Sequence, residues 1–203
     1  MSKTKFERAR IPLTRMAGGL GLLAICLTKS AWETKSELIA VLLFCIGAVL
    51  VAVASMGRMW CSLYIAGNKD KMLVTEGPYS LSRNPLYFFN MMGAVGVGFA
   101  TETLTFPILI LVLFGLYYPQ IIRREAVRLK ELFGEQFEKY RQNVPAFFPR
   151  FSGFTEPDRY EVRPVVYRKH IASALWFIWL LGIMEIVEGL NNTGVFHSQW
   201  SLF

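Results

Sequence analysis

The sequence predicts an all-α fold, a polytopic membrane bundle of about five transmembrane helices, and two observations carry this prediction. Hydrophobic residues make up 53% of the 203 residues and charged residues only 18%, below the roughly 25% of a soluble domain. The apolar residues also gather in long uncharged blocks, whereas helices of soluble domains interleave apolar and polar positions. The same composition excludes disorder, and three cysteines give no disulfide framework.

Five segments qualify as membrane spans, because a helix needs roughly 20 apolar residues to cross the hydrocarbon core of a bilayer. The expected spans are residues 13–28, 38–57, 85–100, 103–122 and 171–190. Residues 38–57 and 103–122 contain no charged residue at all. The spans 85–100 and 103–122 are separated by two residues only, which indicates a tight helical hairpin.

The first apolar segment, 13–28, also has the basic start and apolar middle of a secretory signal peptide. The residues that follow, Lys29-Ser30-Ala31-Trp32, lack a clean small-x-small cleavage site. We therefore interpret 13–28 as the first span of the bundle.

Lys and Arg are confined almost wholly to one side of this arrangement. Of the 22 Lys and Arg, only Lys29 and Lys35 fall outside the segments 1–12, 58–84 and 123–170 and the start of the first span. Because positive residues collect on the cytoplasmic side, we expect a cytoplasmic N-terminus and a C-terminus on the opposite side. Topology thus explains the net charge of +7, and the scattered basic residues do not indicate nucleic-acid binding.

The first long cytoplasmic segment contains a turn and a helix start. Gly77-Pro78 favours a turn, since Gly accepts a positive φ and Pro fixes the next φ. Asn84-Pro85 is typical of a helix N-terminus, with Asn as N-cap and Pro at the first helical position. Arg83 therefore lies at the positive end of a helix, an arrangement that suits a carboxylate or another anion. A capped helix with an interfacial arginine is the alternative explanation.

The second long cytoplasmic segment, 123–170, opens with an amphipathic helix. Apolar residues recur every three or four positions from Leu129 to Tyr140 and form one face, and Val144-Pro145 ends the helix. The pattern alone predicts that this face packs on the bundle rather than lining a ligand pocket. Glu125 stands apart, because it lies one turn from the bilayer between arginines, where a solvated charge is less expected.

At these residues the sequence resembles the isoprenylcysteine carboxyl methyltransferase and phospholipid methyltransferase superfamily of integral-membrane enzymes. The family signature joins an Arg-His-Pro-x-Tyr element, a hydrophobic span and a Glu-Glu pair, usually with Gly-Pro-Tyr ahead of it. Here Gly77-Pro78-Tyr79 and Arg83-Asn84-Pro85-Leu86-Tyr87 match the first part, and Glu125 matches the first glutamate. The likeness covers roughly residues 70–150.

Two positions depart from the family pattern. Asn84 replaces the usual His, and an amide cannot take up a proton near pH 7, which weakens any scheme with a general base at this position. Ala126 replaces the second glutamate, so one carboxylate remains where the family has two.

The resemblance implies S-adenosylmethionine as the cofactor, held on the cytoplasmic side in a pocket formed by the amphipathic helix and the loop. It also implies methyl transfer to a lipid-like acceptor from the bilayer: an isoprenylcysteine carboxylate, a phospholipid amine, or a hydrophobic thiol or small molecule. Arg83 and Glu125 are the expected catalytic residues. The expected cofactor-binding residues are Gly77, Pro78, Tyr79, Arg83, Asn84, Pro85, Tyr87, Glu125 and Tyr140. We expect Arg58 and Trp60 to meet the acceptor, and neither a metal nor nucleic acid as a partner.

Two other functions stay open on the sequence. Sterol reductases resemble the same pattern of an acidic helix followed by Tyr and Val-Pro, so an NADPH-dependent membrane reductase is the alternative enzyme. Those enzymes are normally larger, and the Gly-Pro-Tyr turn favours methyl transfer. A non-catalytic membrane scaffold is the other alternative, which leaves the pairing of the Arg83–Tyr87 element with Glu125 unexplained.

Overall fold

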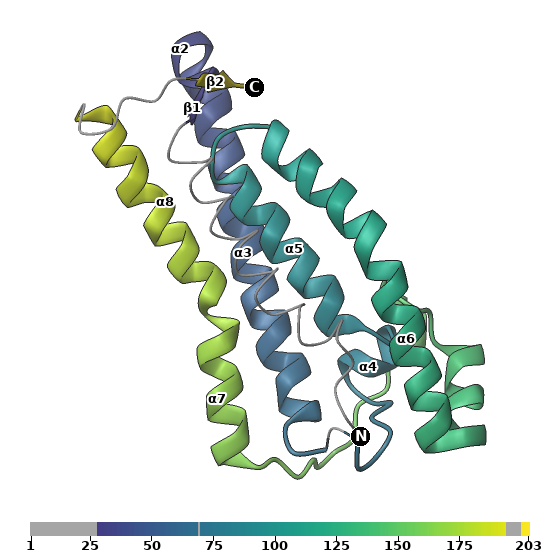
Figure 1. The fold of residues 1–203 in the computed structure, drawn as a ribbon. Coiled ribbons are helices and arrows are strands. Elements are labelled where there is room, and N and C mark those ends of the chain that lie inside the picture. The colour runs from purple at the N-terminus through teal and green to yellow at the C-terminus, as the bar shows by residue number, and fades with distance from the viewer. Residues whose placement is uncertain (1–27, 69, 194–199) are drawn as a thin grey trace, which may run out of the picture.

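The computed structural model describes residues 28–68, 70–193 and 200–203, and these residues are mostly helical (Figure 1). The longer helices are α3 (Glu37–Ile65), α5 (Pro85–Phe99), α6 (Thr105–Asn143), α7 (Pro164–Ala174) and α8 (Trp176–Asn192). The short elements are β1 (Thr28–Ser30), α2 (Trp32–Lys35), α4 (Pro78–Leu81), the 3-10 helix η1 (Phe151–Gly153) and β2 (Trp200–Leu202). The strands β1 and β2 pair in parallel. The expected all-α fold is confirmed.

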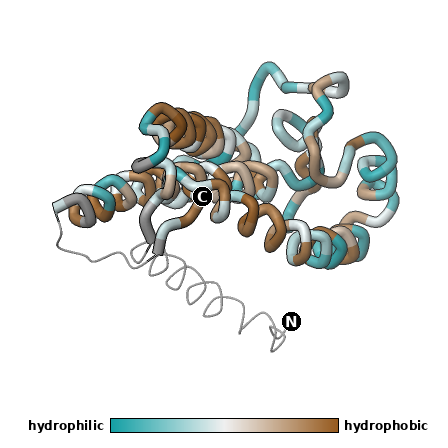
Figure 2. The backbone as a smooth tube through the Cα atoms, turned by 90° about the horizontal axis from the view of Figure 1, so that it is seen from above, coloured by the Kyte–Doolittle hydropathy of each residue, from teal (hydrophilic) through white to brown (hydrophobic). Residues whose placement is uncertain are grey.

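Three of the described helical stretches are long and apolar enough to cross a membrane. They are Glu37–Ile65, Thr105–Asn143 and Pro164–Leu190, while the apolar helix α5 is shorter. Large apolar side chains are exposed along α3, α6 and α8, as a lipid environment requires, and Figure 2 shows the same runs of hydrophobic residues along the helices. The predicted span 13–28 lies outside the described residues except for Thr28, so the five-span arrangement stays a prediction.

The packing of α3 against α5 forms the centre of the bundle (Figure 1). Gly47 on α3 and Gly96 on α5 allow the two backbones to approach closely, since a Cβ at Gly47 would lie 2.6 Å from the Gly96 carbonyl oxygen. Close approach through small residues is typical of helices in membranes. Helices α7 and α8 contact α3, and α6 contacts α5, so every long helix is anchored to this central pair.

Helix α6 is longer than the predicted span and does not end at the arginines that follow residue 122. It continues through the amphipathic segment to Asn143, with a kink at Gly134, where φ is 51° and ψ is −121°. A Cβ at Gly134 would meet no atom within 4 Å, so the backbone conformation rather than space requires glycine here. The kink brings Lys130 Nζ within 2.8 Å of Glu138 Oε1, although eight positions span about 12 Å along a straight helix.

The segment between α6 and α7 is hydrogen-bonded to the turn that precedes α4 and to the end of α3. The Gly77 N–H donates to the Thr155 carbonyl oxygen at 2.8 Å. The Tyr64 hydroxyl donates to Glu156 Oε1 at 2.8 Å, and the Tyr160 hydroxyl donates to the Tyr64 carbonyl oxygen at 2.7 Å. These bonds fix the turn at Gly77 and thereby the position of α4.

Replacement of Gly77 tests this anchoring. Gly77 has φ 58° and ψ −130°, and a Cβ there would lie 2.4 Å from the Tyr64 ring. We expect Gly77→Ala to lower the free energy of unfolding by about 2 kcal/mol, measured as a lower midpoint of thermal unfolding in detergent. Gly115→Ala on α6 is the matched control, because its Cβ meets nothing within 4 Å. Equal midpoints for the two variants would contradict the role of Gly77.

Candidate functional site

A cavity of about 750 Å³, including its open mouth, lies where the loop after α3, the start of α5 and the second half of α6 meet. Seven of the nine predicted cofactor-binding residues line it: Tyr79, Arg83, Asn84, Pro85, Tyr87, Glu125 and Tyr140. The other two, Gly77 and Pro78, are buried in the turn and do not line the cavity.

Arg83 is held by the chain that follows α6 and keeps its terminal nitrogens available. Its backbone N–H donates to the Pro145 carbonyl oxygen at 2.9 Å, and its Nε donates to the Val144 carbonyl oxygen at 3.0 Å. Within the described residues, its two Nη groups make no hydrogen bond or ion pair. Burial lowers the pKa of Arg83 from its ordinary value, yet a guanidinium stays charged in proteins. The result is an oriented cation in the cavity wall that suits a carboxylate.

Asn84 occupies the predicted N-cap position, but its side chain makes no capping hydrogen bond. Its Nδ2 donates instead to the Ala146 carbonyl oxygen at 2.8 Å, and the Ser82 hydroxyl accepts the Asn84 N–H at 3.2 Å. The expected capping role is therefore corrected. The physical reason is that carbonyl groups of the extended chain after α6 lack helical partners and need donors. Donation to the Ala146 carbonyl needs one N–H group on the side chain and no group that titrates.

Tyr79 and Tyr140 form the buried floor of the cavity, each with 7% of its surface exposed. The Tyr140 hydroxyl donates to the Tyr79 carbonyl oxygen at 2.6 Å. The Tyr79 hydroxyl is buried and has no hydrogen-bond partner among the described residues. Burial raises the pKa of Tyr79 well above its ordinary value, so the phenol stays neutral and is a hydrogen-bond donor. An unpaired buried hydroxyl is costly, and the Tyr79 ring also packs in a core cluster with Cys61 and Tyr64.

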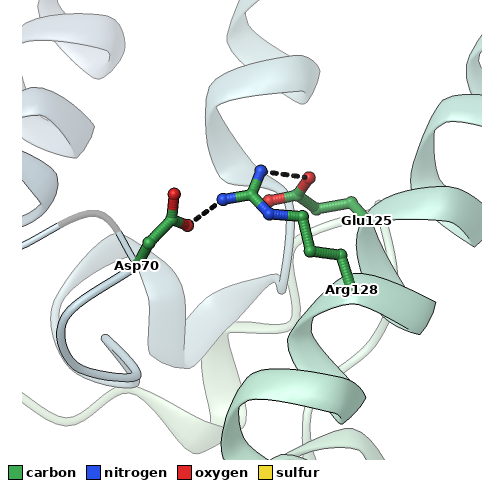
Figure 3. A network of polar contacts seen from close by, with 3 residues as sticks. All are labelled: Asp70, Glu125 and Arg128. Atoms are coloured by element: carbon green, nitrogen blue, oxygen red, sulfur yellow. Dashed lines mark ion pairs between the residues drawn. The ribbon is translucent and has the colours of Figure 1, made fainter. Parts of the chain in front are cut away.

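Another part of the cavity wall carries two carboxylates, of which the sequence predicted one. Glu125 on α6 and Asp70 in the loop after α3 both line the cavity. Arg128 pairs with both carboxylates, with 3.6 Å between its Nη1 and Glu125 Oε2 (Figure 3). The sequence analysis missed Asp70 because it lies in a loop and belongs to no motif.

The amphipathic face of α6 divides between two environments. Leu129 and Phe133 line the cavity, whereas Phe137 is buried. The prediction that this face packs on the bundle is therefore wrong for its first half. The reason is that α6 packs mainly on α5, and the loop after α3 faces Leu129 and Phe133 across the cavity.

Arg58 and Trp60 do not line the cavity. The Arg58 guanidinium donates to the Ser173 hydroxyl at 3.0 Å and lies 5.0 Å from the Phe177 ring centroid. The Trp60 ring lies 6.0 Å from the Phe154 ring. These contacts join α3 to the α7–α8 region and to the segment after α6, so contact with an acceptor stays a prediction for both residues. Within the described part of the chain, no three His, Cys, Asp or Glu side chains are grouped so that they could hold a metal.

The elements that build the cavity coincide with a match to a known family. Residues 36–136, from the start of α3 to just beyond the Gly134 kink, match the phospholipid methyltransferase family. The protein-S-isoprenylcysteine O-methyltransferase of Schizosaccharomyces pombe is 32% identical over 82 residues, which cover 40% of this chain and 35% of that protein. The chain belongs to this superfamily of membrane methyltransferases. The resemblance seen in the sequence is thereby confirmed, and its apolar helices make this member a membrane protein.

Two relatives match almost the whole chain. The nickel-cobalt-cadmium resistance protein NccN of Alcaligenes xylosoxydans xylosoxydans is 38% identical over 95% of this chain and 87% of its own length. The cobalt-zinc-cadmium resistance protein CzcN of Cupriavidus metallidurans is 36% identical over 96% of this chain and 89% of its own length. No solved structure matches the chain.

Proposed function

We propose that this protein transfers the methyl group of S-adenosylmethionine to a lipid-like acceptor in the membrane. The observation that carries the proposal is the chemistry of the cavity wall. The wall joins Arg83, whose Nη groups make no bond within the described residues, a buried phenol without a partner there, and two carboxylates paired with Arg128, with apolar side chains between them. S-adenosylmethionine offers a carboxylate, an ammonium group, a sulfonium, ribose hydroxyls and an aromatic base. Each of these groups has a complementary residue in the wall.

The proposed contacts follow from that complementarity. Arg83 binds the methionyl carboxylate through its free Nη groups, in the two-pronged manner of guanidinium–carboxylate pairs. Glu125 and Asp70 accept the ammonium group or the ribose hydroxyls. The rings of Tyr79 and Tyr87 pack on the adenine or face the sulfonium, which an aromatic face attracts.

The chain's own task in this reaction is alignment rather than proton transfer. S-adenosylmethionine supplies a methyl group on a sulfonium, which is already an activated leaving group. Alignment of the acceptor and exclusion of water then lower the barrier, and the buried floor of Tyr79 and Tyr140 serves both. A thiolate or carboxylate acceptor needs no base, and an amine needs only a neutral lone pair. This agrees with Asn84, whose side chain donates to a carbonyl and cannot take up a proton.

The same wall argues against the nicotinamide alternative. Among the described residues that line the cavity, Arg83 is the one basic residue, against the two carboxylates of Asp70 and Glu125. NADPH carries several phosphate charges and would require more cations than carboxylates. We further propose that the cavity opens to the cytoplasm, in line with the distribution of Lys and Arg, and that the acceptor arrives from the bilayer.

Loss of the charged wall residues tests the cofactor. We expect Arg83→Ala and Glu125→Ala each to weaken S-adenosylmethionine binding roughly tenfold or more, because hydrogen bonds to charged groups contribute about 1.5–3 kcal/mol. Isothermal titration of the detergent-purified protein measures this, with NADPH titrated in parallel. Arg123→Ala and Glu131→Ala, exposed on α6 outside the cavity, are the matched controls. Binding of NADPH without binding of S-adenosylmethionine would overturn the proposal.

Removal of the partnerless hydroxyl of Tyr79 separates binding from stability. Because this hydroxyl has no partner in the described protein, we expect Tyr79→Phe to leave the thermal midpoint of the free protein unchanged or raised. The variant should bind S-adenosylmethionine about fivefold more weakly, the value of one neutral hydrogen bond of about 1 kcal/mol. Tyr140→Phe is the contrast, because its hydroxyl does have a protein partner and its loss should lower the midpoint. Unchanged affinity in Tyr79→Phe would exclude this contact.

The names of the two long relatives suggest the setting of the reaction, and we propose that methyl transfer by this protein supports resistance to heavy metals. A strain lacking the gene should grow poorly on nickel, cobalt or cadmium, and the wild-type gene should restore growth. The Arg83→Ala gene should not restore growth, because it removes the cofactor contact. Labelled methyl groups traced into lipid, protein and small-thiol fractions identify the acceptor. Full restoration by Arg83→Ala would separate resistance from methyl transfer.

A further inference from the structure

Three charged residues form a bridge on the exposed side of the cavity. Arg128 on α6 pairs through one terminal nitrogen with Asp70 in the loop after α3 and through the other with Glu125 (Figure 3). Their side chains are 40%, 44% and 28% exposed, respectively, whereas Tyr79 and Tyr140 on the floor are each 7% exposed. The bridge therefore lies at the mouth of the cavity and the tyrosines lie at its base.

The bridge joins α6 to the loop after α3, and both parts line the cavity. Helix α6 packs mainly on α5. The Arg128–Asp70 ion pair links α6 to the loop between α3 and α4. Asp70 has φ 65°, a left-handed conformation that Asp tolerates better than most residues other than glycine. The carboxylate of this turn residue reaches Arg128.

We propose that Arg128 is a positioning residue that acts as a clasp. It holds Glu125 in the cavity wall and holds the Asp70 edge of the loop over the mouth, and it releases Asp70 each time a ligand passes. The guanidinium suits this task because its separate nitrogens serve two carboxylates at once. Its half-exposed ion pairs are also weak enough to open, since a pair of this kind changes the equilibrium between the closed and open mouth only a few-fold. Salt weakens such pairs further by screening. The identity of the passing ligand rests on the proposed function, whereas the opening of the mouth does not.

The first experiment measures opening without any cofactor. A reporter cysteine, Val74→Cys in the cavity wall, is introduced with Cys26→Ser and Cys45→Ser, and its rate of reaction with a charged maleimide is followed. The buried Cys61 stays in place, and the same protein without Val74→Cys gives its background rate. We expect Arg128→Gln and Asp70→Asn each to accelerate labelling about threefold, with the double variant no faster than either. Added salt should accelerate the parent but not these variants. Arg123→Gln is the matched control on the same helix.

Labelling rates that stay at the parent value in Arg128→Gln would overturn the clasp and leave an ordinary surface ion pair. The same result follows if Arg128→Gln and Arg123→Gln accelerate labelling equally, because the effect would then come from lost charge alone.

The second experiment follows the release of bound S-adenosylmethionine. We expect Arg128→Gln to release it about threefold faster and Arg128→Lys to restore part of the loss, because an ammonium can hold one carboxylate but lacks the planar fork. Accelerated labelling together with no binding of S-adenosylmethionine supports the clasp and overturns the proposed cofactor. Arg83-dependent binding together with unchanged labelling and release supports the cofactor and overturns the clasp.

Discussion

The site depends on the hydrogen bonds between residues 82–84 and the chain that follows α6. The N–H groups and side chains of this short segment donate to the successive carbonyl oxygens of residues 144–147. Each bond contributes only about 1 kcal/mol net, but a carbonyl left unpaired in a part-buried position would cost more. These bonds join the start of α5 to the end of α6 and so set the width of the cavity between them. Arg83 serves in this junction through its N–H and Nε, which leaves its Nη groups for a ligand.

The site also depends on the kink at Gly134, because the hydrogen bonds to residues 144–147 require the end of α6 to turn back toward α4. A straight helix would carry Tyr140 away from α4. With the kink, the Tyr140 hydroxyl reaches the Tyr79 carbonyl oxygen, and both rings close the floor. The Tyr79 carbonyl thus contributes to the protein's own stability, whereas the buried Tyr79 hydroxyl has no partner among the described residues.

Motif spacing predicted most of this site, and the limits of the prediction have physical causes. Arg83, Glu125 and Tyr140 were predicted because Arg83 and Glu125 match the family motif and Tyr140 ends the apolar periodicity of a helix, and all three line the cavity. The length of α6 was missed because charged residues end an apolar span, yet Arg and Glu are good helix formers and do not end a helix. Asp70 was missed because it lies in a loop and belongs to no motif, so nothing in its sequence neighbourhood shows that the loop reaches α6. Leu129 and Phe133 were misplaced because periodicity identifies a buried face but cannot say whether protein or a cavity covers it.

The charges of the site also bear on turnover under the proposed function. In the free protein, Arg128 is paired with both carboxylates at the mouth, and in the proposed complex it pairs with Asp70 again once the ligand has passed. Glu125 and Asp70 attract a cationic ligand inside the cavity, and the charge of Arg128 weakens this attraction. S-adenosylmethionine carries one more positive charge than the product that remains after methyl transfer, so the product is attracted less strongly than the substrate. This difference in charge favours release of the product over release of the substrate without any change in the shape of the cavity.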